Sequence, residues 1–182
     1  MKAEELKADP KFLKELIVHA SNQLRLVFGM YHGVTNIEYP GVFTWGRHTV
    51  SSEELQLSAT EEELAFSSLE HSVIYLAMVQ IHTTLEIVFD DPFHVDDQIA
   101  SDAFQISRLT RNAFAHNPFA PIWEVREVWR KKYEVPDIIR IDATGLDGKP
   151  VKSEHYGGPL SVFRLLEFVS SLIDEKLTQQ NV

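Results

Sequence analysis

The sequence predicts an all-α protein: a four-helix-bundle-like domain with a long aromatic loop and a small β-hairpin before its last helix. Four long segments place apolar residues at helical spacing. The chain has 182 residues, 44% of them hydrophobic, which is enough to bury one sizeable core. It contains no cysteine, so hydrophobic burial and not disulfides must hold that core together. We therefore expect one domain over residues 1–182.

The first helix is expected to begin at Asp9-Pro10 and to run to about Met30. An aspartate at the N-cap accepts hydrogen bonds from otherwise unpaired N–H groups, and a proline loses nothing at the first helical position. The apolar residues that follow at helical spacing are Phe12, Leu13, Leu16, Ile17, Ala20, Leu24 and Val27.

Residues 31–59 interrupt the helical period with several glycines and Pro40, and they carry aromatic side chains. A disordered linker would contain fewer aromatic residues. We interpret this segment as a long ordered loop that lies on the bundle, with a short helix at 52–57.

The second and third helices are expected to form the centre of the domain. Thr60 and Glu63 form a capping-box pattern that opens a helix to about Val88. This helix is apolar on two sides, which suits a central position. One stripe consists of Phe66, Leu69, Val73 and Leu76, and the other of Ile74, Ala77, Met78, Ile81, Leu85 and Val88. Asp96 is expected to cap the third helix, which should stop near His116 because Pro118 disfavours a helical conformation at the preceding residue.

The C-terminal third is expected to contain a hairpin and a final helix. Residues 121–135 fit neither the helical nor the strand period and stay unassigned. The segments 138–143 and 150–156 flank an Asp-Gly turn signal, which predicts a β-hairpin over 138–156. Gly158-Pro159 then starts a helix with a polar C-terminal tail. Its apolar face consists of Val162, Leu165, Leu166, Val169, Leu172 and Ile173.

The formal charge of −10 argues against a surface that attracts phosphate everywhere. Between Arg108 and Lys132, however, six positive side chains face two negative ones, a net charge of +4. Such a patch could confine a polyanion to one site, although a run of charge is more often a solvated surface. The first fifteen residues lack the apolar core of a signal peptide, and no run of 18 apolar residues occurs. We expect a cytoplasmic protein without a membrane partner.

Most familiar catalytic and metal-binding patterns are missing from the sequence. His82 and Glu86 are spaced to share a metal ion, yet no third ligand is placed by the sequence, so we interpret them as an interior hydrogen-bonded pair. His71 shares a helix face with His82, but their α-carbons would lie about 16 Å apart, too far for one ion to bridge. There is no glycine-rich phosphate loop, no GxSxG elbow and no cysteine nucleophile. No metal or cofactor is expected.

RNAFAH, residues 111–116, stands at the predicted end of the third helix. The spacing of arginine and histidine alone is weakly specific, and the asparagine directly after the arginine makes the pattern moderately specific. The segment resembles the Rx4-6H motif of the HEPN superfamily. Many members of that superfamily are metal-independent endoribonucleases, and they are helical bundles that dimerise. The resemblance implies a homodimer that acts on RNA, with Arg111, Asn112 and His116 as catalytic residues. It also implies a role in toxin–antitoxin or defence systems, with an antitoxin or a nucleotidyltransferase as a further partner.

Helix geometry adds a condition to this hypothesis. Arg111 and His116 lie about 140° apart around an ideal helix and about 7.5 Å apart along its axis, so they do not point together. They meet only if the helix unwinds before Pro118 or if a two-fold axis joins two copies. Arg111 also shares a stripe with Phe104 and Arg108, a mixed composition that suits a dimer interface or the edge of a cleft.

The implied chemistry is attack of a ribose 2′-OH on the adjacent phosphate, which leaves a 2′,3′-cyclic phosphate. His116 would remove the 2′-OH proton or protonate the leaving 5′-oxygen, and Arg111 would stabilise the charge on the phosphorane. Asn112 would orient the phosphate or the histidine. The cations expected to hold flanking phosphates are Arg108, Arg126, Arg130, Lys131 and Lys132.

Two other interpretations of the motif stay open. A histidine in a last helical turn interacts favourably with the helix dipole, and an arginine there can bond to free carbonyl groups, so the motif could serve only to end the helix. Alternatively, the protein is a non-catalytic dimeric helical domain that binds a protein partner or a nucleotide.

Overall fold

The structure, a computed structural model, describes residues 9–33, 41–89, 92 and 97–180. Most of this part of the chain is helical, which confirms the all-α class. The described helices are α2 (Pro10–Gly33), the short α3 (Ser52–Leu55), α4 (Ala59–Val88), α5 (Gln98–Ala115) and α6 (Gly158–Gln180). Two small antiparallel hairpins, β1–β2 and β3–β4, accompany them.

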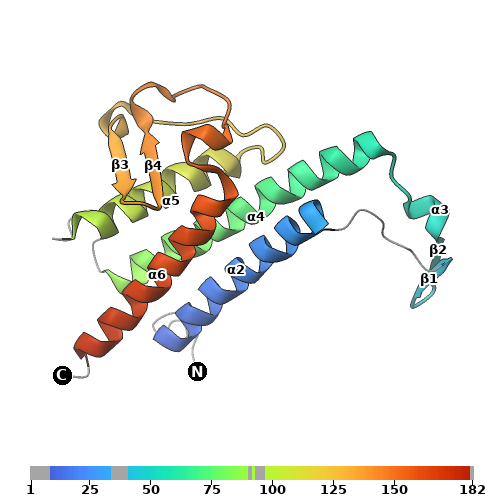
Figure 1. Cartoon of the computed structure of the whole chain (residues 1–182), viewed down its shortest axis with the longest axis horizontal. Coiled ribbons are helices and arrows are strands. Elements are labelled where there is room, and N and C mark those ends of the chain that lie inside the picture. The colour runs from blue at the N-terminus through green and yellow to red at the C-terminus, as the bar shows by residue number, and fades with distance from the viewer. Residues whose placement is uncertain (1–8, 34–40, 90–91, 93–96, 181–182) are drawn as a thin grey trace.

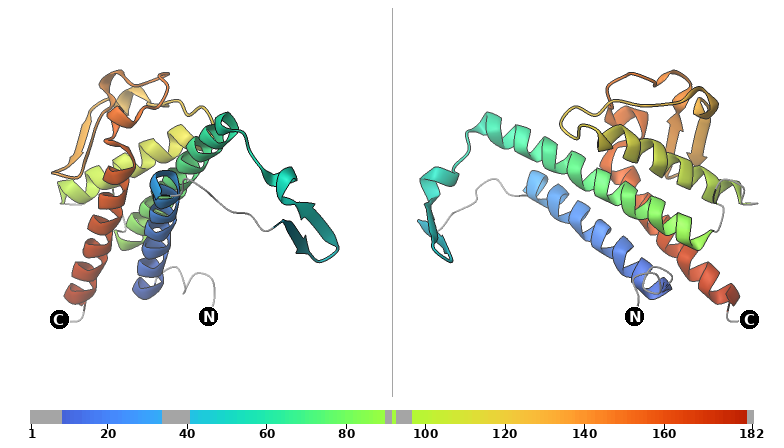
Figure 2. Two further views of the ribbon diagram at one scale, coloured as in Figure 1. Left: turned by 45° about the vertical axis from the view of Figure 1, so that its right-hand side comes forward. Right: turned by 180° about the vertical axis from the view of Figure 1, so that it is seen from behind.

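Helix α4 occupies the centre, as its apolar composition predicted. It packs against α2, α5 and α6, and the three lie around it in Figures 1 and 2. The stripe that includes Ile74, Met78 and Ile81 is buried in the core except at Val88, which is partly buried. The other predicted stripe is only partly covered, because Leu69 and Leu76 remain about 40% exposed. The expectation that both sides of this helix are buried is therefore right for one stripe only.

The helix starts differ slightly from those expected. Asp9 accepts a hydrogen bond from the Lys11 N–H at 2.9 Å, as predicted for the cap of α2. The capping box of α4 uses Ser58 and Glu61 instead of Thr60 and Glu63, because the same S/T-x-x-E pattern occurs two residues earlier and lengthens the helix. Asp97 caps α5, and the predicted cap Asp96 lies outside the described residues.

The expected loop over 31–59 is wrong in two respects. Helix α2 continues to Gly33, and residues 42–51 form a hairpin in which β1 (Val42–Trp45) pairs with β2 (His48–Ser51). Gly46 has a φ of +59° and stands first in the two-residue turn, where a type II′ hairpin requires glycine. The hairpin and α3 stand away from the helices and do not lie on them (Figures 1 and 2). Residues 34–40 of the expected loop are outside the described residues.

The predicted hairpin over 138–156 is right about its first strand, 138–143, and wrong about the partner, 150–156. Strand β4 (Ile139–Asp142) pairs with β3 (Lys132–Val135), which precedes it, through a tight turn in which Asp137 has a φ of +61°. Residues 149–151 instead exchange backbone hydrogen bonds with residues 121–123, so they are unavailable to β4. The short 3-10 helix η3 (Ser153–His155) follows. The β3–β4 hairpin packs on α5 and α6.

The last helix begins at Gly158 and buries the six predicted apolar residues of its inner face. The predicted polar tail is helical as far as Gln180, and residues 181–182 are outside the described residues. By length and composition alone, α4 is the one helix in the described ranges that would suffice to cross a membrane. Of the apolar window in this helix, 28% is buried against the rest of the described structure.

Candidate functional site

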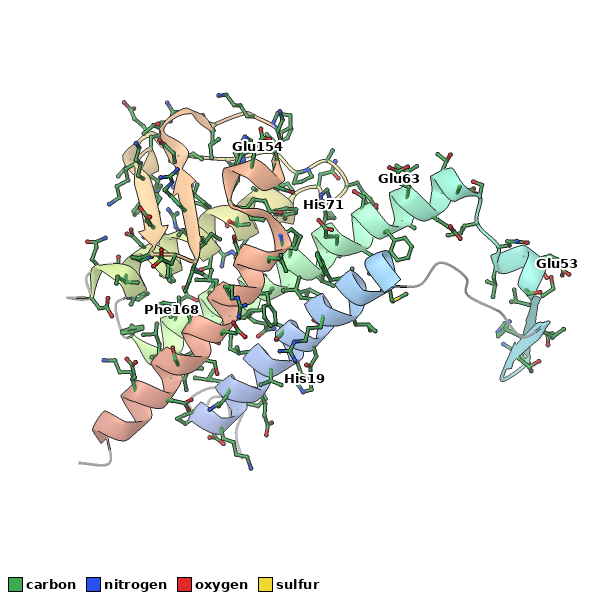
Figure 3. All side chains as sticks on the ribbon, viewed as in Figure 1. His19, Glu53, Glu63, His71, Glu154 and Phe168 are labelled. Atoms are coloured by element: carbon green, nitrogen blue, oxygen red, sulfur yellow. The ribbon has the colours of Figure 1, made fainter. Side chains whose placement is uncertain are left out.

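The RNAFAH motif lies at the junction of α5, α4 and the loop that follows α5. Helix α5 ends at Ala115, and His116 is its C-cap residue, as Pro118 predicted. The Asn117 side chain then accepts hydrogen bonds from the Phe119 and Ala120 N–H groups, which turns the chain. His71 of α4 contacts the carbonyl oxygen of Pro118 through its Nδ1 at 2.8 Å, and this bond ties the loop to α4 (Figure 3).

Asn112 holds the guanidinium of Arg111. Both Nε and Nη2 of Arg111 donate to Oδ1 of Asn112, at 3.2 and 3.1 Å. The two side chains are half-buried, and no carboxylate of the described residues pairs with Arg111. The arginine therefore presents an uncompensated positive charge in an orientation that the neighbouring amide fixes.

His116 lies at the surface, separate from Arg111. Its side chain is 73% exposed, and its Nε2 is 3.5 Å from Oε2 of Glu124. Within the described chain, His116 makes no hydrogen bond to Arg111. The structure thus agrees with the expectation from helix geometry that one copy does not bring the two groups together.

A cleft of about 400 Å³ opens beside the motif, between α5 and the segment 124–130. Three of the predicted phosphate-binding arginines line it, together with Asn112 of the motif. The residues around the cleft are Arg108, Asn112, Glu124, Val125, Arg126, Trp129, Arg130 and Asp147. Two of the lining residues contact the motif: Glu124 contacts His116, and Asn112 accepts hydrogen bonds from Arg111. Arg111 and His116 therefore lie next to the cleft lining without being part of it.

Arg108 forms the floor of the cleft. Its guanidinium carbon lies 4.1 Å from the centre of the Trp129 ring, and its Nε donates to Gln105 at 3.0 Å. Burial lowers the pKa of Arg108, and the charges of Arg111 and Arg126 act in the same direction. Arginine keeps its proton at neutral pH despite such shifts. The stacked guanidinium is therefore a fixed, partly desolvated positive charge.

Asp147 closes the far side of the cleft. One of its carboxylate oxygens accepts from the Val125 N–H at 2.9 Å, and the other accepts from Nη2 of Arg130 at 2.7 Å. These bonds fix the segment 125–130 across from α5. Arg126, in contrast, is exposed and has no carboxylate partner in the described part of the chain, so its charge is available to a ligand.

Two of the predicted phosphate-binding residues lie elsewhere. Lys132 is paired with Asp142 at 3.4 Å on the β3–β4 hairpin, and Lys131 lies over the Tyr133 ring at 5.3 Å. Neither lines the cleft. Sequence analysis missed Trp129 and Asp147, which hold two of the cleft arginines in place. An aromatic residue within the basic run EVWRKK was a usable signal for the first, whereas nothing near Asp147 indicated its role.

The stripe of Phe104, Arg108 and Arg111 is not an open interface as a whole. Phe104 is buried in the core, where its ring stacks on His82 of α4 at 4.4 Å between centroids. The segment after α5 covers this part of the helix, since β3 packs directly on α5. Of the three stripe residues, Arg108 lines the cleft, and Phe104 and Arg111 do not.

His82 lies just beneath the two arginines. Burial, together with the nearby charges of Arg111 and Arg108, lowers the pKa of His82 to about 4. Its Nε2 is 3.4 Å from Oε1 of Glu86, whose side chain is 53% exposed, so the expected interior pair is buried on the histidine side only. No three histidine, aspartate or glutamate side chains of the described ranges gather as metal ligands would.

Comparison of the chain with protein families, with curated proteins and with solved structures gives no match. The functional argument therefore depends on the cleft and the motif themselves.

Proposed function

We propose that this chain is a HEPN-type endoribonuclease, a four-helix-bundle-like protein that cuts RNA as a homodimer without a metal. One observation carries the proposal: Arg108, Arg126 and Arg130 converge on a single cleft whose border includes the motif residue Asn112. These arginines are concentrated at one place on a chain with a formal charge of −10, which directs a polyanion to that place.

The cleft supports binding of a phosphate backbone. A guanidinium presents two parallel N–H groups that match two phosphate oxygens, and it stays charged when partly buried. Arg108 is fixed by Trp129, and Arg126 has no competing carboxylate in the described chain. Arg130 is shared with Asp147, so its contribution to phosphate binding is the weakest of the three.

The motif supports the cleavage step. The ribose 2′-oxygen forms a bond to the adjacent phosphorus, and the bond from phosphorus to the 5′-oxygen breaks. His116 takes the 2′-OH proton or supplies the proton that the leaving 5′-oxygen needs, and Glu124 orients its ring. Arg111, held by Asn112, faces the negative charge that develops on the phosphorane.

The proposed homodimer would bring Arg111 and His116 together, although they are separate within one chain. A two-fold axis near the end of α5 places the His116 side chain of one copy beside the Arg111 side chain of the other. The high exposure of His116 supports this arrangement, because the imidazole is accessible to a second molecule.

The experiment is cleavage of mixed RNAs by the purified full chain in EDTA. We expect His116→Ala and Arg111→Ala each to lower the cleavage rate by roughly 100-fold or more. His19→Ala, a change at an exposed position on α2, serves as the matched control and should cleave like the wild type. If the wild type and both variants bind RNA but none of them cleaves it, the protein is better described as a non-catalytic binding domain.

A further inference from the structure

Residues 41–70, here called the arm, extend away from the helical body. The arm contains β1, β2, α3 and the first turns of α4, and Figures 1 and 2 show it projecting beyond the ends of the other helices. A two-stranded hairpin is marginally stable by itself in water. Contact with another molecule that covers its surface would therefore stabilise the hairpin.

The arm carries acidic and apolar side chains on its surface. It contains six glutamates and one arginine, a net charge of −5. Glu53 and Glu63 both point into solvent, at the far end and near the root of the arm (Figure 3). The exposed large apolar residues of the arm are Val42, Leu55, Leu57, Leu64 and Leu69.

The surface around the cleft has the complementary composition. The lining of the cleft carries three arginines against Glu124 and Asp147, a net charge of +1 on a chain whose formal charge is −10. The stretch of chain between Arg108 and Lys132 also exposes apolar side chains outside the cleft lining: Phe119 is 75% exposed, Val128 is 71% exposed and Ile122 is 49% exposed. Acidic and apolar groups on the arm thus match basic and apolar groups at the cleft, as the two sides of an interface do.

The direction of the arm decides whose cleft it fits. His71 anchors α4 to the loop of its own motif, and the helix continues for eleven residues beyond it to Thr60, about 16 Å. The hairpin at the end of this helix is carried away from α5 and from the β3–β4 hairpin (Figure 2). We propose that the arm of one copy docks on the basic cleft of a second copy, and that the two copies exchange arms about a two-fold axis.

This arrangement defines the interface of a dimer without bound RNA and gives the cleft a form of control. Each arm is rooted beside its own motif, so the exchange holds the two motifs within about one arm length of each other. The arm glutamates occupy the surface that phosphates would occupy, so RNA and the arm compete for the cleft. The interface depends on the charge and shape of the cleft and would exist whether or not the proposed cleavage occurs.

The first test is sedimentation of the full chain without RNA at low and high salt. We expect a dimer that high salt weakens. The variant Glu62→Gln/Glu63→Gln should raise the dissociation constant about tenfold or more, because each change acts at both arms. Glu61 stays unchanged, since it caps α4. The control Glu15→Gln/Glu175→Gln removes the same charge from exposed positions on α2 and α6 and should dimerise like the wild type.

A charge exchange tests the pairing itself. Chains with Glu62→Lys/Glu63→Lys carry an arm whose net charge changes from −5 to −1 and keep the basic cleft, whereas chains with Arg126→Glu keep the acidic arm and carry a less basic cleft. Each variant alone should dimerise poorly. A mixture of the two should form heterodimers, because the acidic arm of the Arg126→Glu chain then meets the unchanged basic cleft of the other chain. Circular dichroism of each variant checks that the helices are intact.

The outcomes separate this inference from the proposed function. A wild-type monomer at all concentrations, a dimer that ignores the arm changes, or a mixture without heterodimers would overturn the arm exchange. Efficient RNA cleavage by a protein whose dimer ignores the arm would overturn this inference alone. An arm-dependent dimer that never cleaves RNA would support it and overturn the nuclease proposal.

Discussion

Replacing His82 by leucine should make the free energy of unfolding less sensitive to mild acid. His82 is only 3% exposed, and it is stacked on Phe104 between α4 and α5. Burial lowers its pKa from 6.5 to about 4, with Arg111 and Arg108 adding to the effect. The imidazole is therefore neutral in the folded protein at a pH where the unfolded chain already binds a proton.

The sign and size of the effect follow from proton linkage. Above pH 6.5 the imidazole is neutral in both states, so it adds no pH dependence. Below that value only the unfolded chain binds the proton, and the free energy of unfolding falls until the pH nears about 4. The difference between the two pKa values corresponds to roughly 3 kcal/mol, most of it lost by pH 4.5.

Urea unfolding at pH 7 and at pH 4.5 measures this contribution. Between those two conditions the wild type should lose about 2 kcal/mol more than His82→Leu. His19→Leu, which changes an exposed histidine on α2, should follow the wild type. Equal losses for the wild type and His82→Leu would show that His82 is not held neutral beneath the two arginines, and the reasoning about its burial would be wrong.

Three further predictions address the core, the backbone and the cleft. Thr110→Val should raise the free energy of unfolding by about 1 kcal/mol, because the buried hydroxyl has no hydrogen-bond partner in the described chain; an unchanged urea midpoint would contradict this. Gly157→Ala should lower the free energy of unfolding by about 1–3 kcal/mol, since its φ is +85° and a methyl group would collide with a side chain of α6. Gly29→Ala, in open space on α2, should raise it by up to about 1 kcal/mol, and thermal melts that reverse this order would refute the backbone argument. Arg126→Ala should weaken RNA binding and lower its salt dependence by about one ion, whereas Lys132→Ala, outside the cleft, should do less in the same anisotropy titration.

The helices were predictable from the sequence because their signals are local. Apolar spacing located the four long helices, and Pro118 set the end of α5 to within a residue of the observed one. The observed cap of α4, Ser58, lies two residues before the predicted one, because two overlapping capping patterns compete for the same helix start. Local spacing cannot rank two such caps.

The hairpins were harder, because strand pairing depends on contacts between separate segments. The Asp-Gly signal at 147–148 does mark a turn, with Gly148 at a φ of +72°. The chain after that turn bonds to residues 121–123, a segment that the sequence pattern left unassigned. The β1–β2 hairpin was missed because its strands are only four residues long, too short for a clear alternation.

The candidate site was predicted in part. The motif and the arginines at 108, 126 and 130 were found from spacing and local charge, and these arginines do share one cleft. The basic run alone could not show that Lys132 is paired with Asp142 on the hairpin. The role of Asp147 depends on a bond across 17 residues to Arg130, which no local pattern encodes.

The most direct test of the proposed nuclease is the chemistry of the RNA ends. A defined RNA and the same RNA with a single 2′-deoxyribose at the cleaved position would be incubated with the purified chain in EDTA. The account predicts 2′,3′-cyclic phosphate ends from the first RNA, no cleavage at the modified position of the second, and no such ends with His116→Ala. Cleavage at the deoxyribose, or cyclic ends that persist in the His116→Ala variant, would contradict it.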